Sequence, residues 1–482
     1  MAGVRSGGDT RPAEAKRLGV VALALVNVGA VLGLRNYPAV ALSGWGSIGW
    51  YLIGAVCFLI PMALVASELA TAWRGDGGIY TWVRTAFGDT AGSVAVFCEW
   101  SSNLVRYPAV LAFVASAFVY ALDPRLADDG PFMFLVMMVA FWGATLVALL
   151  GSRTASVVGA FGVAAGTVAP ALVIAGLGIA FIVAGRRPLI PATGIGAVAP
   201  HVGGNLPMVG VAILMFSGME VIGFHTARAR DPHHTLPRAM LLSGAIILIL
   251  AIVGTLAISW VVPASTLELA AGVMQAFEAF LHTFGLSGLF APLALLVAVG
   301  ATAGLLSWMV GPALGLTQAA QQGLMPAMFG RVSRRGAPTG VLLMQAGIGT
   351  LIAVAYLFIP GITAVYWTLS AITLELGAIV YLLVFASFIR LRFTHAQVPR
   401  PFRVPGGKAG AWLCGGVGVA ACAFTMGVLL LPPRAAQAGS PLVFAAVMLA
   451  GTAALALPPL VLARMGRRRR PASPPPAEPA ES

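Results

Sequence analysis

Apolar runs of about 20 residues recur along this 482-residue chain, and each is long enough to cross a lipid bilayer as a helix. Hydrophobic residues make up 59% of the chain and charged residues only 9%, whereas soluble domains carry about 25% charged residues. Two soluble domains of this length are excluded, because so little charge cannot cover their surfaces. The runs are continuously apolar, which argues against a β-barrel. The sequence therefore predicts an all-α polytopic membrane protein embedded in the lipid bilayer.

The pattern of these runs predicts 12 transmembrane helices. The expected spans cover about 18–42, 48–72, 92–122, 132–150, 157–184, 208–224, 240–262, 289–317, 340–358, 363–388, 412–431 and 442–463. Residues 264–284 are mildly amphipathic, and we expect them to lie along the membrane interface. The polar segment 1–16 and the charged, proline-rich segment 465–482 are expected to be cytoplasmic tails, the second of them disordered.

The lysines and arginines are distributed unequally between the two sides of this predicted topology. Of the 29 basic residues, 23 fall in connections on the side that holds both termini, and four fall on the opposite side. Cytoplasmic connections of membrane proteins are enriched in Lys and Arg. We therefore expect a multi-pass protein of the plasma (inner) membrane with both termini in the cytoplasm. The net charge of +13 follows the same pattern, so no nucleic-acid partner is expected.

The chemistry-bearing residues do not form the motifs of an enzyme or an ATP-driven pump. The four cysteines all lie in apolar segments, without the spacing of a metal site. No Gly-x4-Gly-Lys-Ser/Thr phosphate loop is present. His233 and His234 are adjacent, but no cluster of carboxylates accompanies them, as a membrane-bound transferase would need. The sequence therefore predicts no catalysis, no metal and no cofactor.

Two expected spans contain small residues that can interrupt a helix. Ser217 and Gly218 lie inside the sixth span, and Gly29 and Gly33 lie inside the first. Interrupted spans at corresponding places of two halves are typical of transporters built on inverted repeats. We expect repeats over 17–200 and 201–392, followed by two peripheral helices within 393–464. The alternative is a continuous helix that uses Gly218 for close packing against a neighbour.

Such breaks leave the ends of half-helices open near the middle of the membrane. The N-terminal ends attract a carboxylate, and the free carbonyls at the C-terminal ends accept an ammonium group. That pairing suits a zwitterionic amino acid. The pattern therefore favours a small-molecule amino acid substrate bound near the bilayer midplane.

Five charged residues lie within the expected spans, where a charge costs several kcal/mol unless it is paired or hydrated: Arg35, Glu99, Arg106, Glu220 and Glu375. Arg35 is interpreted either as an anchor for a substrate carboxylate or as a gate that pairs with Glu99 or Glu220. Glu220 has three alternatives: binding a substrate amine, carrying a coupling proton, or capping the second half of the broken helix. We group Glu99, Arg106, Glu220 and Glu375 as candidates for gating or coupling.

Several short motifs resemble those of one transporter superfamily. They are Ser67-Glu68-Leu69-Ala70, Gly77-Gly78-Ile79-Tyr80, Ala86-Phe87-Gly88, Tyr37-Pro38, Met219-Glu220, Leu236-Pro237-Arg238, Ala271-Gly272-Val273-Met274, Ser307-Trp308-Met309-Val310-Gly311-Pro312 and Phe402-Arg403-Val404-Pro405-Gly406. Together they resemble the amino acid–polyamine–organocation superfamily, and within it the glutamate/GABA antiporter branch. The resemblance covers about residues 16–465.

The resemblance implies a secondary active transporter of amino acids, an antiporter or proton-coupled permease that works by alternating access. The implied fold is a LeuT-like five-plus-five inverted repeat with broken helices 1 and 6, plus two peripheral helices. Carried onto this chain, the implied substrate-binding residues are Val28, Gly29, Ala30, Gly33 and Arg35 in helix 1, Phe216, Ser217, Gly218 and Met219 in helix 6, and Trp308 in helix 8.

Three positions depart from the pattern of the glutamate/GABA branch. Asn36, Arg228 and Gly304 stand where that branch has acidic residues. Two alternatives therefore stay open, a polyamine or amine permease of the same fold and a membrane sensor that does not transport. The sequence leaves open which substrate is carried, whether exchange or proton symport drives it, and the oligomeric state.

Overall fold

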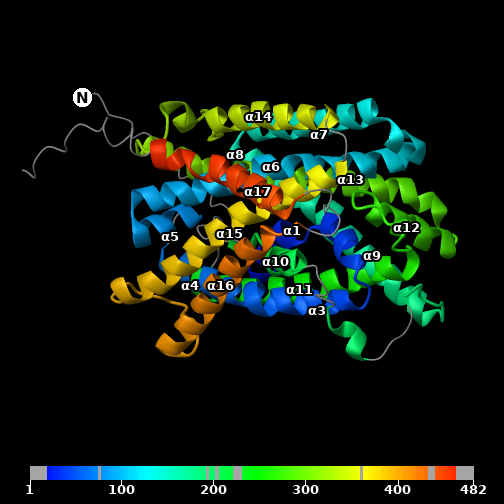
Figure 1. Ribbon diagram of the computed structural model, residues 1–482, viewed down its shortest axis with the longest axis horizontal. Helices are drawn as coiled ribbons and strands as arrows, with labels where there is room; N and C mark the ends of the chain where they lie inside the picture. Colours follow the sequence, from blue (N-terminus) through cyan, green and yellow to red (C-terminus); the bar gives the residue numbers. More distant parts are fainter. Residues whose placement is uncertain are drawn as a thin grey trace, which may run out of the picture.

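The computed structural model describes residues 19–73, 78–190, 195–200, 206–220, 231–358, 362–432 and 440–462. All regular secondary structure within these ranges is helical, which confirms the all-α class. Ten helical spans in them are long and apolar enough to cross a membrane. The long helices lie side by side, with α7 (Gly130–Leu149) and α14 (Thr339–Phe358) along one edge (Figure 1). Helices α1 (Val20–Val31) and α10 (Pro207–Leu214) lie near the middle of the bundle (Figure 1).

Most of the expected spans correspond to single long helices. These are α6 (Asp89–Leu122), α7, α11 (Pro232–Val261), α13 (Phe290–Gln321), α15 (Ile362–Thr394), α16 (Gly407–Leu429) and α17 (Pro441–Ala456). The span expected at 208–224 is represented by α10 (Pro207–Leu214), which has only 8 residues, and residues 221–230 lie outside the described ranges. The ninth expected span corresponds to α14. Its part Thr339–Val354 is apolar but shorter than the ten spans above. The total of 12 therefore stays a prediction.

The first span is broken, as the sequence predicts. Helix α1 (Val20–Val31) ends before Leu32 and Gly33, whose ψ angles of 98° and 95° are extended. The chain then resumes as a 3-10 turn, η1 (Leu34–Asn36), and a short helix, α2 (Tyr37–Ala41). Backbone groups freed by such a break are tolerated at membrane depth only inside protein or beside a wet cavity.

The second and fifth spans each contain a π-helical turn. The second runs through α3 (Gly46–Gly54), η2 (Ala55–Leu59) and α4 (Ile60–Ala72), and the fifth through α8 (Ser152–Val163), η4 (Ala164–Val168) and α9 (Ala169–Val183). A proline follows each turn, Pro61 in α4 and Pro170 in α9. Proline lacks the N–H of the regular helical pattern and its ring crowds the preceding turn, so a local change of winding is expected there.

Two shorter helices lie between the spans. Helix α5 (Gly78–Phe87) connects the second and third spans and packs against α6 and α15. Helix α12 (Gly272–Thr283) falls within the segment expected at the interface and buries Phe277 and Phe280 on one face. Both helices are amphipathic and lie in connections between spans.

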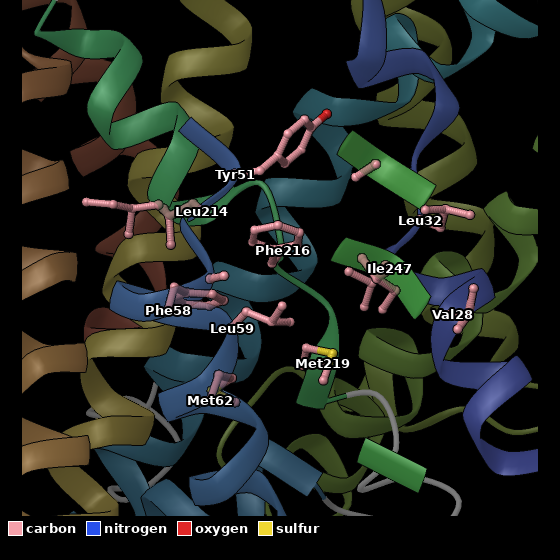
Figure 2. Packing of buried hydrophobic residues seen from close by; sticks show 14 of the residues in the cluster. Val28, Leu32, Tyr51, Phe58, Leu59, Met62, Leu214, Phe216, Met219 and Ile247 are labelled. Atoms are coloured by element: carbon pink, nitrogen blue, oxygen red, sulfur yellow. The ribbon is translucent and has the colours of Figure 1, made fainter. Parts of the chain in front are cut away.

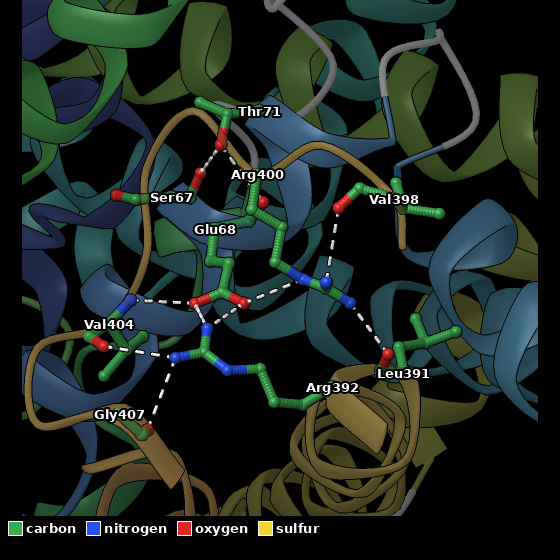
Figure 3. A network of polar contacts seen from close by, with 9 residues as sticks. All are labelled: Ser67, Glu68, Thr71, Leu391, Arg392, Val398, Arg400, Val404 and Gly407. Carbon is green, nitrogen blue, oxygen red and sulfur yellow. Dashed lines mark hydrogen bonds and ion pairs between the residues drawn. The ribbon is translucent and has the colours of Figure 1, made fainter. Parts of the chain in front are cut away.

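A buried ion cluster ties three distant segments together (Figure 3). Glu68, near the end of α4, pairs with Arg392 of α15 and with Nε of Arg400 at 3.1 Å. Its carboxylate also accepts the backbone N–H of Val404 at 2.8 Å. Arg84 of α5 lies outside this cluster and pairs with Asp89 at 2.7 Å, a contact that raises the pKa of the arginine.

Candidate substrate site

A cavity of about 230 Å³ lies where the break in the first span faces the end of α10. Its wall includes Gly29, Ala30, Gly33 and Arg35 from the first span, Ser217 after α10, Asn103 and Arg106 from α6, Gly304 and Trp308 from α13, and Thr373 from α15. Ligand pockets are mostly apolar with a few well-placed polar groups, and this one matches that description at the size of a small solute. The two interrupted segments therefore share one cavity.

Two arginines give this cavity a positive character. Arg35 and Arg106 both line it, and no acidic side chain among the described residues does. The Arg106 guanidinium lies 4.5 Å from the centroid of the Trp308 ring, which is the geometry of a cation–π contact. A guanidinium presents paired N–H donors that match a carboxylate. The cavity is therefore suited to a solute that carries a carboxylate.

The sixth span is interrupted at Gly218. Helix α10 ends at Leu214, and the N–H of Ser217 donates to the Leu214 carbonyl at 3.0 Å, closing a turn. Gly218 follows with a φ of 113°, a conformation that side-chain-bearing residues rarely adopt. A β-carbon there would lie 3.0 Å from Cζ2 of Trp308 and 3.4 Å from the carbonyl oxygen of Ala30. Glycine is required both for the backbone conformation and for the close approach.

Hydrogen bonds hold this interruption against α15. The N–H of Gly218 donates to Oε2 of Glu220 at 3.1 Å and to the hydroxyl of Tyr381 at 3.0 Å. The Tyr381 hydroxyl in turn donates to Oε1 of Glu220 at 3.0 Å. The Tyr381 ring stacks edge-on against Phe58 at 4.8 Å, which fixes its position. Glu220 thus bonds to the backbone of the break and does not line the large cavity.

A second, smaller cavity of about 20 Å³ adjoins the first. Arg106, Ser217, Trp308 and Thr373 line both. The small cavity adds Glu99, Ser102, Glu220 and Tyr381 to this wall. Glu99 is only 6% exposed, and neither of its carboxylate oxygens has a hydrogen-bond partner. Sequence reasoning named three of the charged residues that meet here, Glu99, Arg106 and Glu220.

Three of the expected substrate contacts lie in the packed core instead of the cavity wall (Figure 2). Val28 is fully buried, and the Phe216 ring packs against Tyr51 at 5.9 Å. The sulfur of Met219 accepts a hydrogen bond from the side-chain amide of Asn27 at 3.2 Å. Substrate contact by Val28, Phe216 and Met219 stays a prediction, and the structure gives these side chains packing partners.

The expected coupling residue Glu375 lies away from both cavities, whereas Asn103 and Tyr381 line them. Glu375 of α15 is 3% exposed, lines neither cavity, and has one carboxylate oxygen without a partner. Its coupling role stays a prediction. Asn103 and Tyr381 were not anticipated. Asn103 follows Glu99 by one helical turn, and this polar pair inside an apolar span is the signal that could have identified it.

The donor set of the site suits an organic solute. Among the described residues, no group of three or more His, Cys, Asp or Glu side chains is placed to hold a metal ion. The polar part of the cavity wall consists of guanidinium, hydroxyl and amide groups. A bundle of membrane-spanning helices with an interrupted span on either side of a cavity that holds a few polar groups is typical of transporters with discontinuous helices.

Comparison with known proteins places the chain within that class. The family model described as amino acid permease matches residues 18–453, and the protein belongs to this family of membrane transporters. Its relatives are permeases and antiporters, not enzymes. The family lies in the superfamily that the sequence motifs resemble, which confirms that assignment.

The most similar relatives include transporters of bacteria. The chain is 34% identical over 420 residues to an uncharacterized transporter of Legionella pneumophila, covering 87% of this chain and 90% of the relative. It is 27% identical over 462 residues to a glutamate/gamma-aminobutyrate antiporter of Lactococcus lactis, covering 94% and 92%. It is also 27% identical over 372 residues to a probable agmatine/putrescine antiporter of Lactococcus lactis, covering 76% and 78%.

Solved structures share the fold. The crystal structure of a manganese transporter of Eremococcus coleocola superposes with a TM-score of 0.58 at 16% identity, covering 93% of this chain and 94% of that chain. At this level of identity the likeness concerns the fold alone.

Proposed function

We propose that this protein is a secondary active transporter of amino acids that works by alternating access. The observation that carries the proposal is the cavity of about 230 Å³ between the two interrupted spans, lined by Arg35 and Arg106. Both guanidinium groups attract a carboxylate, and the half-helix ends around them supply further backbone donors and acceptors. Substrate would bind there while the two repeats rock around it.

The character of the cavity favours a carboxylate-bearing amino acid over a diamine. A di-cationic polyamine would face two arginines in the large cavity, where no described acidic side chain balances them. The relatives named as glutamate/gamma-aminobutyrate antiporters support the same choice. The relative named as a probable agmatine/putrescine antiporter keeps amine transport as the alternative to test.

The proposed orientation and location follow from the charge distribution of the sequence. Both termini would lie in the cytoplasm, with the protein in the plasma (inner) membrane, because 23 of the 29 basic residues fall in connections on that side. Exchange, proton symport and uniport are all compatible with one cavity of this kind. Uptake driven by an imposed pH gradient, compared with uptake driven by internal substrate, separates these modes.

The decisive experiment is binding followed by counterflow. Purified protein is screened for thermal stabilisation by single amino acids and by amines, and each ligand found is tested for exchange in proteoliposomes. We expect exchange of at least one carboxylate-bearing amino acid. Binding without any exchange would identify a sensor, and exchange of putrescine or agmatine alone would identify a polyamine permease.

A further inference from the structure

Glu99 is a buried carboxylate with unmet hydrogen-bonding capacity. It lies in the middle of α6, is 6% exposed, and neither side-chain oxygen has a partner within the described part of the chain. Buried polar groups in proteins nearly always have a partner, because leaving one unpaired is costly. A donor beyond those that the described residues provide would complete this site.

The small cavity beside Glu99 has room for one such donor. Its volume of about 20 Å³ exceeds the roughly 10–15 Å³ that a single water-sized group requires. An ammonium group is close to water in size. The cavity is therefore matched to one small polar group and not to a whole amino acid.

Three hydroxyl-bearing residues, Ser102, Thr373 and Tyr381, line this space. The hydroxyl of Ser102 donates to the carbonyl of Glu99 at 2.8 Å, and that of Thr373 donates to the carbonyl of Leu369 at 2.9 Å. The Tyr381 hydroxyl donates to Glu220. Since a hydroxyl has one proton and two lone pairs, Ser102 and Thr373 are left with acceptor capacity, and Tyr381 keeps one lone pair after it accepts the N–H of Gly218. A ligand at this position would need to be a donor.

The charges of the two cavities are of opposite sign. Glu99 and Glu220 line the small cavity together with Arg106, so its formal charge is one negative. Arg35 and Arg106 line the large cavity without a described acidic side chain, so that space is positive. The two spaces meet at Arg106, Ser217 and Thr373. The combined site is therefore polarised, with Glu99 and Glu220 at one end and Arg35 at the other.

We propose that the Glu99 subsite binds the ammonium group of the substrate while the substrate carboxylate lies toward Arg35 and Arg106. This inference rests on the proposed transport of amino acids and narrows it. The substrate must carry both an amine and a carboxylate, so neither a simple carboxylic acid nor a diamine satisfies both ends. The charged or titratable groups that share the subsite with Glu99 are Arg106 on the same helix, Glu220 after α10 and Tyr381 on α15.

The test compares ligands that differ only in the amine. Binding to the purified full-length protein is measured by calorimetry for L-glutamate against glutarate and for γ-aminobutyrate against butyrate. We expect wild type to prefer the amine-bearing member of a pair. In Glu99→Gln, this preference should fall by about tenfold to a hundredfold, the range for a hydrogen bond to a charged group. Binding of the deaminated member should stay unchanged.

Matched variants keep the test decisive. Glu278→Gln removes a carboxyl of α12 that lines neither cavity, and it should keep the wild-type preference. Glu99→Gln breaks no hydrogen bond of the side chain, so it should fold. If it does not, Glu99→Asp serves instead, because the shortened carboxylate should lower the preference while keeping the charge.

The outcomes separate this inference from the proposed function. An unchanged preference in a folded Glu99 variant overturns the ammonium subsite and leaves amino acid transport standing. If only the pH dependence of binding changes and the preference for the amine stays intact, Glu99 carries a proton. That result would also overturn the ammonium subsite. Failure of wild type to bind any amino acid overturns both.

Discussion

The guanidinium of Arg106 lies 4.5 Å from the centre of the Trp308 ring, so a cation of α6 rests against an aromatic wall of α13. The same indole limits the space at Gly218, where a β-carbon would come within 3.0 Å of Cζ2. The Trp308 side chain of α13 thus lies close both to Arg106 of α6 and to the interruption of the sixth span. Substitutions around Trp308 test whether this geometry serves transport.

Gly218→Ala should abolish transport. The substitution forces a β-carbon against Trp308 and Ala30, and it places alanine at a φ of 113°, which costs about 1–3 kcal/mol in strained conformations. We expect initial uptake in proteoliposomes to fall more than tenfold while the protein still inserts and purifies.

Gly143→Ala is the matched control for Gly218→Ala. Gly143 lies within α7, and a β-carbon there would meet nothing within 4 Å. Alanine is favoured over glycine inside a helix by up to about 1 kcal/mol, so uptake should stay at the wild-type level. Equal uptake by the two alanine variants would show that the backbone at Gly218 is not critical.

Arg35→Ala should abolish uptake of any carboxylate-bearing substrate. Arg35 lines the large cavity directly after the break in the first span, where it presents a forked donor. Loss of a hydrogen bond to a charged group weakens binding by about tenfold to a hundredfold. The measurement is the dissociation constant together with counterflow, with Arg125→Ala as an exposed arginine control. Normal transport by Arg35→Ala would rule out the anchor.

Glu68→Gln should destabilise the protein. The variant leaves Arg392 and Arg400 together without their shared carboxylate, and all three side chains are at most 10% exposed. Removing one partner from a buried ion pair costs about 3–5 kcal/mol. We expect a clear drop in melting temperature, measured on purified protein in detergent.

Asp89→Asn provides the contrast for Glu68→Gln. It breaks the pair with Arg84, whose side chain is 40% exposed, and such surface pairs contribute about 0–1 kcal/mol. If Asp89→Asn lost as much stability as Glu68→Gln, burial would not explain the contribution of the Glu68 ion cluster to stability.

The start of α11 should show a pH dependence that originates in Asp231. The hydrogen bond with His234 is the main cause that holds the pKa of Asp231 below its ordinary value of 3.8. A lowered folded-state pKa means that the stabilisation is present above the unfolded-state value and is lost as the pH falls through the folded-state value.

The corresponding measurement compares wild type with Asp231→Asn at several pH values. Wild type should melt at a slightly higher temperature near neutral pH, and the difference should shrink progressively as the pH falls below 3.8. A difference that persists there would show that the carboxylate charge is not responsible. Asp231 also caps α11 by accepting the N–H of His233 at 3.3 Å, a role that asparagine can keep.

The sequence predicts where the two spans break more reliably than it predicts which side chains face the cavity. Gly33 and Gly218 lie at the interruptions. Small residues inside an apolar span are a local signal, and the sequence alone therefore indicates these positions. Gly29 remains inside α1, where a β-carbon would lie 1.9 Å from Cγ1 of Val163. That glycine serves close packing, and its identity alone does not distinguish packing from a break.

Side-chain direction and long-range partners were beyond sequence reasoning. Ser217 lines the cavity while its neighbour Phe216 packs into the core, because the turn after α10 points adjacent residues in different directions. The partner of Glu68 in α15 lies 324 positions along the chain, and no local pattern links the two. Tyr381 likewise comes from a distant helix, so its hydrogen bond to Gly218 follows only from the tertiary structure.

The two bonds made by the N–H of Gly218 have a consequence for the thermodynamics of binding. They make the interruption an ordered turn, fixed by Glu220 and Tyr381 before any solute arrives. Ordering a flexible backbone costs about 1–2 kcal/mol of conformational entropy per residue. Here that entropy is lost during folding, so a solute that enters meets a surface already in its binding shape. Its contact energy is then expressed as affinity instead of being consumed in ordering the chain.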